Sequence, residues 1–100
     1  MQTHAKKLLV VITEAALEKQ LVRDVRTLGA HGYTVCDVRG GGEHGDREAE
    51  WEGNRSIRLE VIADEPVCAR IAEHILATYC PNFALSMFVA DCGVLRAHKF

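Results

Sequence analysis

Apolar residues first form a continuous run and then recur at helical spacing. Residues 7–13 (KLLVVIT) are almost entirely apolar, which is typical of a central strand buried on both faces. We expect Thr13 to cap the following helix, with Glu14 near its positive end. Spacings of four, four and three then place apolar side chains on one helical face. These residues are Leu17, Leu21, Val25 and Leu28. We expect this helix to stop at Gly29 and Gly32.

The second half of the chain repeats a strand and a helix. Residues 33–39 (YTVCDVR) are rich in β-branched and aromatic side chains and predict a second strand. Residues 56–63 (SIRLEVIA) alternate between apolar and charged positions, which predicts a third strand. Asp64 is expected to cap a second helix with Pro66 in its first turn. Residues 83–89 (FALSMFV) predict a fourth strand, and the tail with Val94, Leu95 and Arg96 would extend this strand or pair again.

This element order predicts an α+β fold of the ferredoxin-like type, βαββαβ, as one domain over residues 1–100. Its antiparallel four-stranded sheet would carry both helices on one face. The other face would combine charged and apolar side chains, and it is too apolar to remain in water. It would present Thr34, Cys36, Val38, Arg58, Glu60 and Ile62. We therefore expect further copies of the chain to cover this face in a closed oligomer with polar clefts between subunits.

Composition restricts the choice of partners. The chain has 100 residues, a formal net charge of -2 and a pI near 6.2, which gives no electrostatic reason to expect binding to nucleic acid or to an anionic membrane. The apolar run after Lys6 and Lys7 is too short for a signal sequence or a membrane span, so we expect a cytoplasmic protein.

Cysteine and histidine spacing does not indicate a metal site. The four cysteines include no C-x-x-C pair, and the five histidines are scattered. Buried thiols are the favoured interpretation, and a disulfide between Cys80 and Cys92 stays open.

Residues 40–54 predict a long polar loop that begins with glycines. Residues 40–45 (GGGEHG) match G-x-G-x-x-G, the dinucleotide-binding pattern. That pattern needs a strand before it and a helix after it within a parallel crossover, and too few residues precede the next strand for such a helix. Backbone N–H groups of successive glycines can instead bind an anion without a helix.

Arginines accompany these glycines, and guanidinium groups bind phosphate through strong directional hydrogen bonds. Arg39 and Arg47 flank the loop, while Arg58 and Arg96 lie on predicted strands. A buried Arg58 needs an anion, which is either Glu60 or a ligand. Trp51 stands alone in the polar segment, where it would cover a ligand, enter a partner or pack on its own domain.

Two segments, TVCDVRGGGEHG and RSIRLEVIADEPVCARIAEHI, resemble PII-type signalling proteins, which are trimeric bacterial sensors of nitrogen and carbon status. The resemblance extends from the first strand to Arg96. It implies a homotrimer that binds adenine nucleotides in the clefts between subunits, without a catalytic cofactor or a metal site. It also identifies residues 41–54 as a mobile T-loop.

The resemblance implies roles for eight residues. Gly40, Gly41 and Gly42 would form the base of the T-loop against the phosphates. Thr34, Glu60 and Ile62 would line the nucleoside pocket. Arg96 would bind phosphate, and Arg58 lies on the neighbouring face.

Three departures from the family pattern matter. CPNFALSM stands where the family has a loop rich in glycine and lysine after the second helix, so ADP or AMP is easier to accommodate and ATP is left open. His44 replaces a metal-orienting glutamine, and residues 40–54 contain no tyrosine for uridylylation. These departures indicate the PII-like branch linked to bicarbonate transport and carboxysomes. They imply bicarbonate as a second ligand and a bicarbonate transporter or carboxysome-related protein as partner, with membrane contact only through that partner.

Two other functions share this element order. A small phosphate-ester or acyl-phosphate hydrolase remains an alternative, but none of the four side-chain amides lies beside the glycines to orient water, so we expect no enzyme activity. RNA-recognition modules stack bases on aromatic residues of the first and third strands. LLVVIT and SIRLEVIA contain no aromatic residue, which excludes RNA binding.

Overall fold

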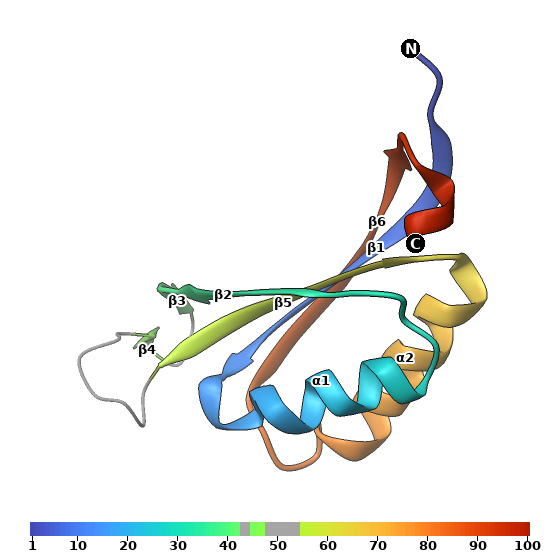
Figure 1. Ribbon diagram of the computed structural model, residues 1–100. Coiled ribbons are helices and arrows are strands. Elements are labelled where there is room, and N and C mark those ends of the chain that lie inside the picture. Colours follow the sequence, from blue (N-terminus) through green and yellow to red (C-terminus); the bar gives the residue numbers. More distant parts are fainter. Residues whose placement is uncertain (43–44, 48–54) are drawn as a thin grey trace.

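The computed structural model describes residues 1–42, 45–47 and 55–100 (Figure 1). The predictions made for His44, Trp51 and Asn54 lie outside these ranges. The strands are β1 (His4–Glu14), β2 (Thr34–Val38), β3 (Gly40–Gly42), β4 (Gly45–Arg47), β5 (Ser56–Ala63) and β6 (Leu85–Val94). The helices are α1 (Glu18–Thr27) and α2 (Glu65–Thr78), with short 3-10 helices η1 (Ala15–Leu17) and η3 (Ala97–Lys99).

The predicted ferredoxin-like fold is confirmed. The four main strands form an antiparallel sheet in the order β2-β5-β1-β6, with α1 and α2 together on one face (Figure 1). In this order β1 is flanked by β5 and β6, which explains its continuous apolar run. Leu9, Val10 and Val11 are all 0% exposed.

The core lies between the sheet and the two helices. The apolar stripe of α1 contributes Leu21 and Val25, and that of α2 contributes Ile71 and Ile75. These side chains meet the helix-facing positions of the strands, such as Leu59. Burying each of them contributes about 1.5–3 kcal/mol to stability, which is why helices with one apolar stripe pack here.

The prediction that Thr13 caps the first helix is wrong. Strand β1 continues through Thr13, whose buried hydroxyl donates a hydrogen bond to the carbonyl oxygen of Ala84 at 3.2 Å. Because threonine is β-branched, it suits a strand as well as a cap, and here it pairs with Ile57 on β5. The 3-10 helix η1 then leads into α1.

The predictions for the end of α1 and the start of α2 are largely confirmed. Gly29 ends α1 in the left-handed region with φ 115, as expected, whereas Gly32 has no such conformation. Asp64 is the N-cap residue of α2, and Pro66 lies in the first turn. The Asp64 carboxylate makes no capping hydrogen bond to the helix. It accepts a hydrogen bond from Nζ of Lys6 at 2.7 Å instead.

Two segments differ from their predicted bounds. Strand β6 begins at Leu85 instead of residue 83 and continues to Val94, so the tail extends this strand, and β6 pairs with β1 from Leu85 to Val94. Residues 40–42 form β3, which pairs with β4 where a loop was predicted. The glycines therefore belong to a short two-stranded ribbon that continues from β2.

The cysteines, potential metal ligands and helix lengths bear on three further predictions. All four cysteines are free, so Cys80 and Cys92 form no disulfide, and Cys68 is the buried one. Within the described ranges, no group of three or more potential ligands could hold a metal ion. No helix among the described residues is long and apolar enough to cross a membrane.

Candidate functional site

The sheet face opposite the helices carries the polar residues that alternation predicts there. Thr34 on β2 lies directly opposite Glu60 on β5, and Cys36 lies opposite Arg58. Ile62 lies further along β5, opposite Leu8 of β1. The structure therefore brings Thr34, Arg58, Glu60 and Ile62 together on one surface, as alternation of side chains along β2 and β5 requires.

An ion pair lies at the centre of this face. Nε of Arg58 donates a hydrogen bond to Oε2 of Glu60 at 2.9 Å, and the two side chains are only 33% and 35% exposed. The guanidinium carbon of Arg58 also lies 5.9 Å from the ring centre of Phe88 on β6. Glu60 thus supplies the anion that a buried arginine needs. The two Nη groups make no further hydrogen bond in the described ranges, so they remain available as donors.

Apolar surface surrounds this ion pair. Phe88 is 48% exposed and lies opposite the fully buried Val10 of β1. A large aromatic side chain beside a half-buried charge pair is characteristic of a surface that another protein covers. The face is therefore suited to contact with other subunits.

A hollow lies where β2 and β5 meet the glycine ribbon. It has a volume of about 350 Å³ and is lined by Asp37, Val38, Arg39, Arg55 and Ser56. Nη2 of Arg55 lies 3.1 Å from Oδ1 of Asp37. The hollow combines two arginines with a carboxylate, so it can hold a small anion that also carries a hydrogen-bond donor.

Arg55 was not identified from the sequence. The sequence does contain the information, because Arg55 immediately precedes the third predicted strand. Antiparallel pairing places the start of that strand beside the end of the second strand. The structure confirms the required register, in which Ser56 pairs with Val38. Arg39 and Arg55 therefore come together at the base of the ribbon.

The glycine ribbon begins directly after this hollow. Gly40 lies opposite Arg47 in the pairing of β3 with β4. Among the described residues, no atom lies within 4 Å of the position that a side chain at Gly40 would occupy. These residues therefore leave the backbone at Gly40 open to a ligand.

Arg96 lies apart from the other candidate residues. The prediction that Arg96 lies on a strand is wrong, because β6 ends at Val94 and Arg96 is the residue before η3. Arg96 is exposed, and its Nη2 lies 3.4 Å from Nε2 of His98. Figure 1 shows η3 and β3 at opposite ends of the molecule. A single chain therefore does not bring Arg96 to the glycines.

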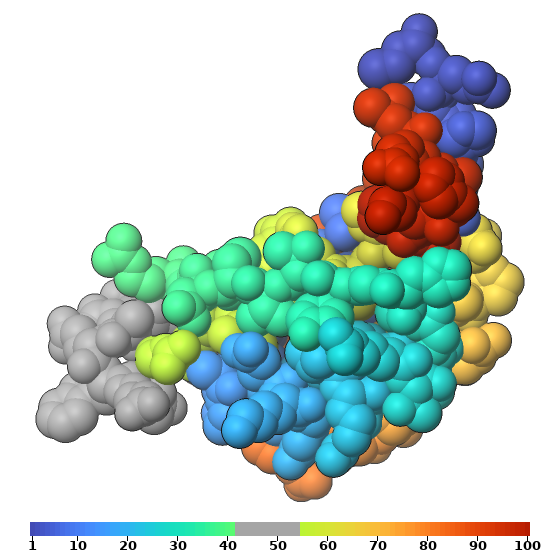
Figure 2. Space-filling view, in the orientation of Figure 1, coloured from blue at the N-terminus to red at the C-terminus, as the bar shows by residue number. Residues whose placement is uncertain are grey.

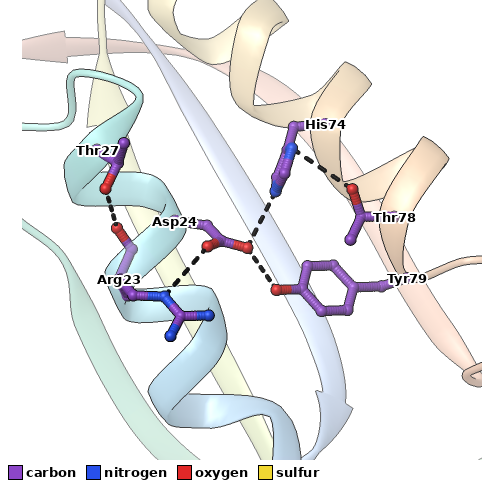
Figure 3. Close-up of polar contacts among 6 residues, drawn as sticks. All are labelled: Arg23, Asp24, Thr27, His74, Thr78 and Tyr79. Carbon is purple, nitrogen blue, oxygen red and sulfur yellow. Dashed lines mark hydrogen bonds and ion pairs between the residues drawn. The ribbon is translucent and has the colours of Figure 1, made fainter.

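A separate polar cluster joins the two helices (Figure 3). Oδ2 of Asp24 on α1 accepts a short hydrogen bond from the Tyr79 hydroxyl and lies 3.0 Å from Nε2 of His74 on α2. Nδ1 of His74 lies 3.4 Å from the Thr78 hydroxyl, and Nε of Arg23 lies 3.7 Å from the other Asp24 oxygen. Nothing in the sequence pattern indicated this cluster, because the packing of the two helices creates it.

The cluster shifts two pKa values in opposite directions. Burial, followed by the hydrogen bond to Asp24 and the charge of that carboxylate, raises the pKa of Tyr79 to about 12. Burial alone would raise the pKa of Asp24, but hydrogen bonds from Tyr79 and His74 and the charge of His74 outweigh it, so this pKa is lowered. Asp24 is therefore held ionised and Tyr79 neutral, which fixes α1 to α2.

The sequence profile of the family described as Nitrogen regulatory protein P-II matches residues 6–99. The chain belongs to the P-II family. It is similar to the solved structure of a PII-like signalling protein from Thermus thermophilus, with 38% identity over 100% of this chain and 99% of that one and a TM-score of 0.86. No protein with a curated description matches the chain.

Other P-II-like structures share the fold at lower identity. CPII from Thiomonas intermedia K12 bound to ADP and bicarbonate has 24% identity over 99% of this chain and 97% of that one, with a TM-score of 0.88. CPII bound to ADP, AMP and bicarbonate has 24% identity over 99% and 96% of the two chains, also with a TM-score of 0.88. These neighbours carry adenine nucleotides and bicarbonate on the fold that this chain adopts.

Proposed function

We propose that the protein is a non-catalytic signalling protein that binds ADP or AMP between the subunits of a homotrimer. Bicarbonate is its second ligand, and the T-loop, residues 41–54 of this single domain, carries the signal to a partner in inorganic-carbon metabolism. The observation that carries the proposal is the open sheet face, where Arg58 and Glu60 pair beside the exposed Phe88.

Contact between subunits follows from the character of this face. Covering a charged group is unfavourable unless it is paired, and here the Arg58 charge already has its partner in Glu60. Covering Phe88 removes apolar surface from water and favours association. Three copies related by closed symmetry would cover the face and leave clefts at its edges.

The nucleotide lies in such a cleft. Thr34, Glu60 and Ile62 face the nucleoside from the sheet, and Gly40, Gly41 and Gly42 hold the phosphates at the base of the ribbon. Arg58 lies on the adjoining surface. Arg96 reaches the phosphates from a neighbouring subunit, since it lies at the opposite end of its own chain. With no glycine- and lysine-rich loop after α2, two phosphates are easier to hold than three, and ATP is the weaker ligand.

Bicarbonate occupies the hollow at the base of the ribbon. Arg39 and Arg55 attract the anion, while Asp37 would repel a fully deprotonated one. Bicarbonate keeps one hydroxyl that can donate to the Asp37 carboxylate, so its donor and acceptor groups match the lining.

Isothermal titration calorimetry with ADP, AMP and ATP tests nucleotide binding. We expect binding heat with ADP and AMP and a lower affinity for ATP. The Arg96→Ala variant should bind each nucleotide with lower affinity than the native protein. Absence of heat with all three nucleotides contradicts the proposal. Repeating the ADP titration with and without bicarbonate at fixed pH tests the second ligand, which is expected to change the affinity.

The signalling function has two further consequences. The hydrolase alternative is tested by phosphate release from ADP and ATP, which is expected not to exceed the spontaneous rate. We also place the protein in the cytoplasm, with a bicarbonate transporter or carboxysome-related protein as its partner. Contact with a membrane then occurs only through that partner, and the net charge of -2 gives no support for direct binding to an anionic surface.

A further inference from the structure

A second hollow lies on the outer face of α1, beside the residue that precedes β2. Its volume is about 470 Å³, and it is lined by residues of α1 and by Tyr33. The buried residues of α1 are Leu21 and Val25, which face the core. The lining residues Lys19, Arg23 and Arg26 project from the opposite side of the helix, and α1 is at the surface in Figure 2.

Three cations follow this side of the helix at spacings of four and three residues. Nε of Arg23 lies 3.7 Å from Asp24, but the Arg23 side chain remains 71% exposed. Lys19 and Arg26 form no ion pair with any residue in the described ranges. Like charges at these spacings destabilise a helix, whereas alternating acids and bases would stabilise it. Repulsion among the three cations therefore opposes formation of the helix, and only Arg26, in the last turn, is favourably placed relative to the helix dipole.

Tyr33 fixes one of these cations. The guanidinium carbon of Arg26 lies 5.0 Å from the Tyr33 ring centre, and the ring is 37% exposed. Stacking of this kind holds the planar guanidinium in one orientation and leaves its N–H edge free to donate. Less side-chain entropy is then lost when an anion binds, and the aromatic ring supplies an apolar wall.

We propose that the hollow on α1 binds an acidic peptide segment of a partner protein. Carboxylates complement Lys19, Arg23 and Arg26, which span about 10 Å along the helix, the length of roughly three residues of extended peptide. Glu18 also lines the hollow, and the chain carries a net charge of -2. Both features oppose a long polyanion such as nucleic acid more strongly than a short acidic segment, which carries fewer charges and can place them against the three cations alone.

This site is independent of the proposed nucleotide cleft. The cleft depends on the sheet face opposite the helices, whereas the hollow lies on the outer side of α1. The outer side of α1 therefore stays accessible in a trimer formed through the sheet face. A partner could contact the T-loop and α1 at the same time, which would increase its affinity without new contacts at either site.

Fluorescence anisotropy with the labelled peptide EGEGEGE tests the proposal on the full chain at low salt. We expect saturable binding that weakens as salt is added. The peptide KGKGKGK and a single-stranded DNA of matched charge should bind more weakly. Arg23→Glu should lower the affinity for EGEGEGE by at least about tenfold, because it places like charges opposite each other. Lys99→Glu, the same charge reversal on an exposed residue outside the hollow, should change it by less than about twofold.

Two substitutions of Tyr33 test the contribution of its stacking on Arg26 separately from that of the positive charges. Tyr33→Ala keeps the net charge and should weaken binding severalfold, whereas Tyr33→Phe keeps the ring and should retain it. If Arg23→Glu fails to give the circular dichroism spectrum of the native protein, the milder Arg23→Gln and Arg26→Gln pair provides the comparison. Absence of saturable binding, equal losses for Lys99→Glu, or tighter binding of the DNA would each overturn the proposal.

Discussion

Replacing Tyr79 by phenylalanine removes one hydroxyl group from the junction between α1 and α2. Tyr79 is 5% exposed, and its hydroxyl donates to the Asp24 carboxylate. The substitution keeps the ring and leaves no cavity. We therefore expect it to report on the hydrogen bond alone.

The expected loss of stability follows from the hydrogen bond. A hydrogen bond to a charged group contributes about 1.5–3 kcal/mol. The pKa of Tyr79 rises from 10.0 to about 12 in the folded chain, mainly through burial and then through the bond to Asp24. Because burial is the largest cause, this shift determines the pH dependence and does not measure the bond. We expect Tyr79→Phe to lower the free energy of unfolding by about 2 kcal/mol at neutral pH.

The pH dependence follows from the directions of the two pKa shifts. A raised pKa stabilises the folded chain below the unfolded value, and this contribution disappears as the pH rises from 10.0 to about 12. The lowered pKa of Asp24 stabilises the folded chain above its ordinary value of 3.8, and this contribution is lost as the pH falls through the lowered value. The advantage of the native protein over Tyr79→Phe should therefore be constant at neutral pH and shrink between pH 9 and 11.

Urea unfolding of both proteins at pH 5, 7, 9 and 11 measures this difference. All samples should have the same protein concentration, because association contributes to apparent stability. Tyr33→Phe is the matched control, since it removes a hydroxyl from an exposed ring and should change stability by less than about 0.5 kcal/mol. A Tyr79→Phe difference no larger than that of the control at pH 7, or one that grows between pH 9 and 11, would refute the reasoning.

Three further predictions concern other parts of the chain. Gly29→Ala should lower stability by about 1 kcal/mol or more in thermal melts, because Gly29 has φ 115, whereas Gly32→Ala should have little effect because it adopts no such conformation; equal losses would contradict this. Cys68 should be the last of the four thiols to react with iodoacetamide, as followed by mass spectrometry, because it is buried and burial raises its pKa; early labelling would contradict this. Phe88→Glu should convert the proposed trimer to monomers in light scattering, whereas Leu76→Glu, a substitution at a similarly exposed apolar position on α2, should not; a persistent trimer in Phe88→Glu would show that the sheet face is not the contact.

The sequence pattern predicted most of the sheet because burial dictates it. The apolar run at residues 7–13 required a strand between two neighbours, and the alternation in residues 56–63 assigned Arg58 and Glu60 to the open face. The end of β6 stayed open because Asp91 and Gly93 interrupt the apolar pattern after residue 89. In the structure Asp91 pairs with Lys7 on the adjacent strand, and such cross-strand pairing cannot be seen in a local pattern.

Those residues of the candidate site that lie on the paired strands β2 and β5 could be predicted from the sequence. Thr34 and Glu60 share the open face as expected, and the structure adds that they lie directly opposite each other. Arg55 was missed because it lies just outside a strand, and the cluster around Asp24 was missed because only the packing of α1 on α2 creates it. Arg96 marks the limit for a single chain, because its proposed role requires a second subunit.

The central claim is that each nucleotide site combines the sheet face of one subunit with Arg96 of another. Mixed trimers of the Arg96→Ala and Thr34→Ala variants test this directly by calorimetry with ADP, because neither substitution removes the Glu60 partner of Arg58. Each variant alone should bind ADP weakly, and refolding the two together should restore tight sites in which both native residues meet. If the mixture binds ADP no better than the separate variants, the site does not lie between subunits, and the account is contradicted.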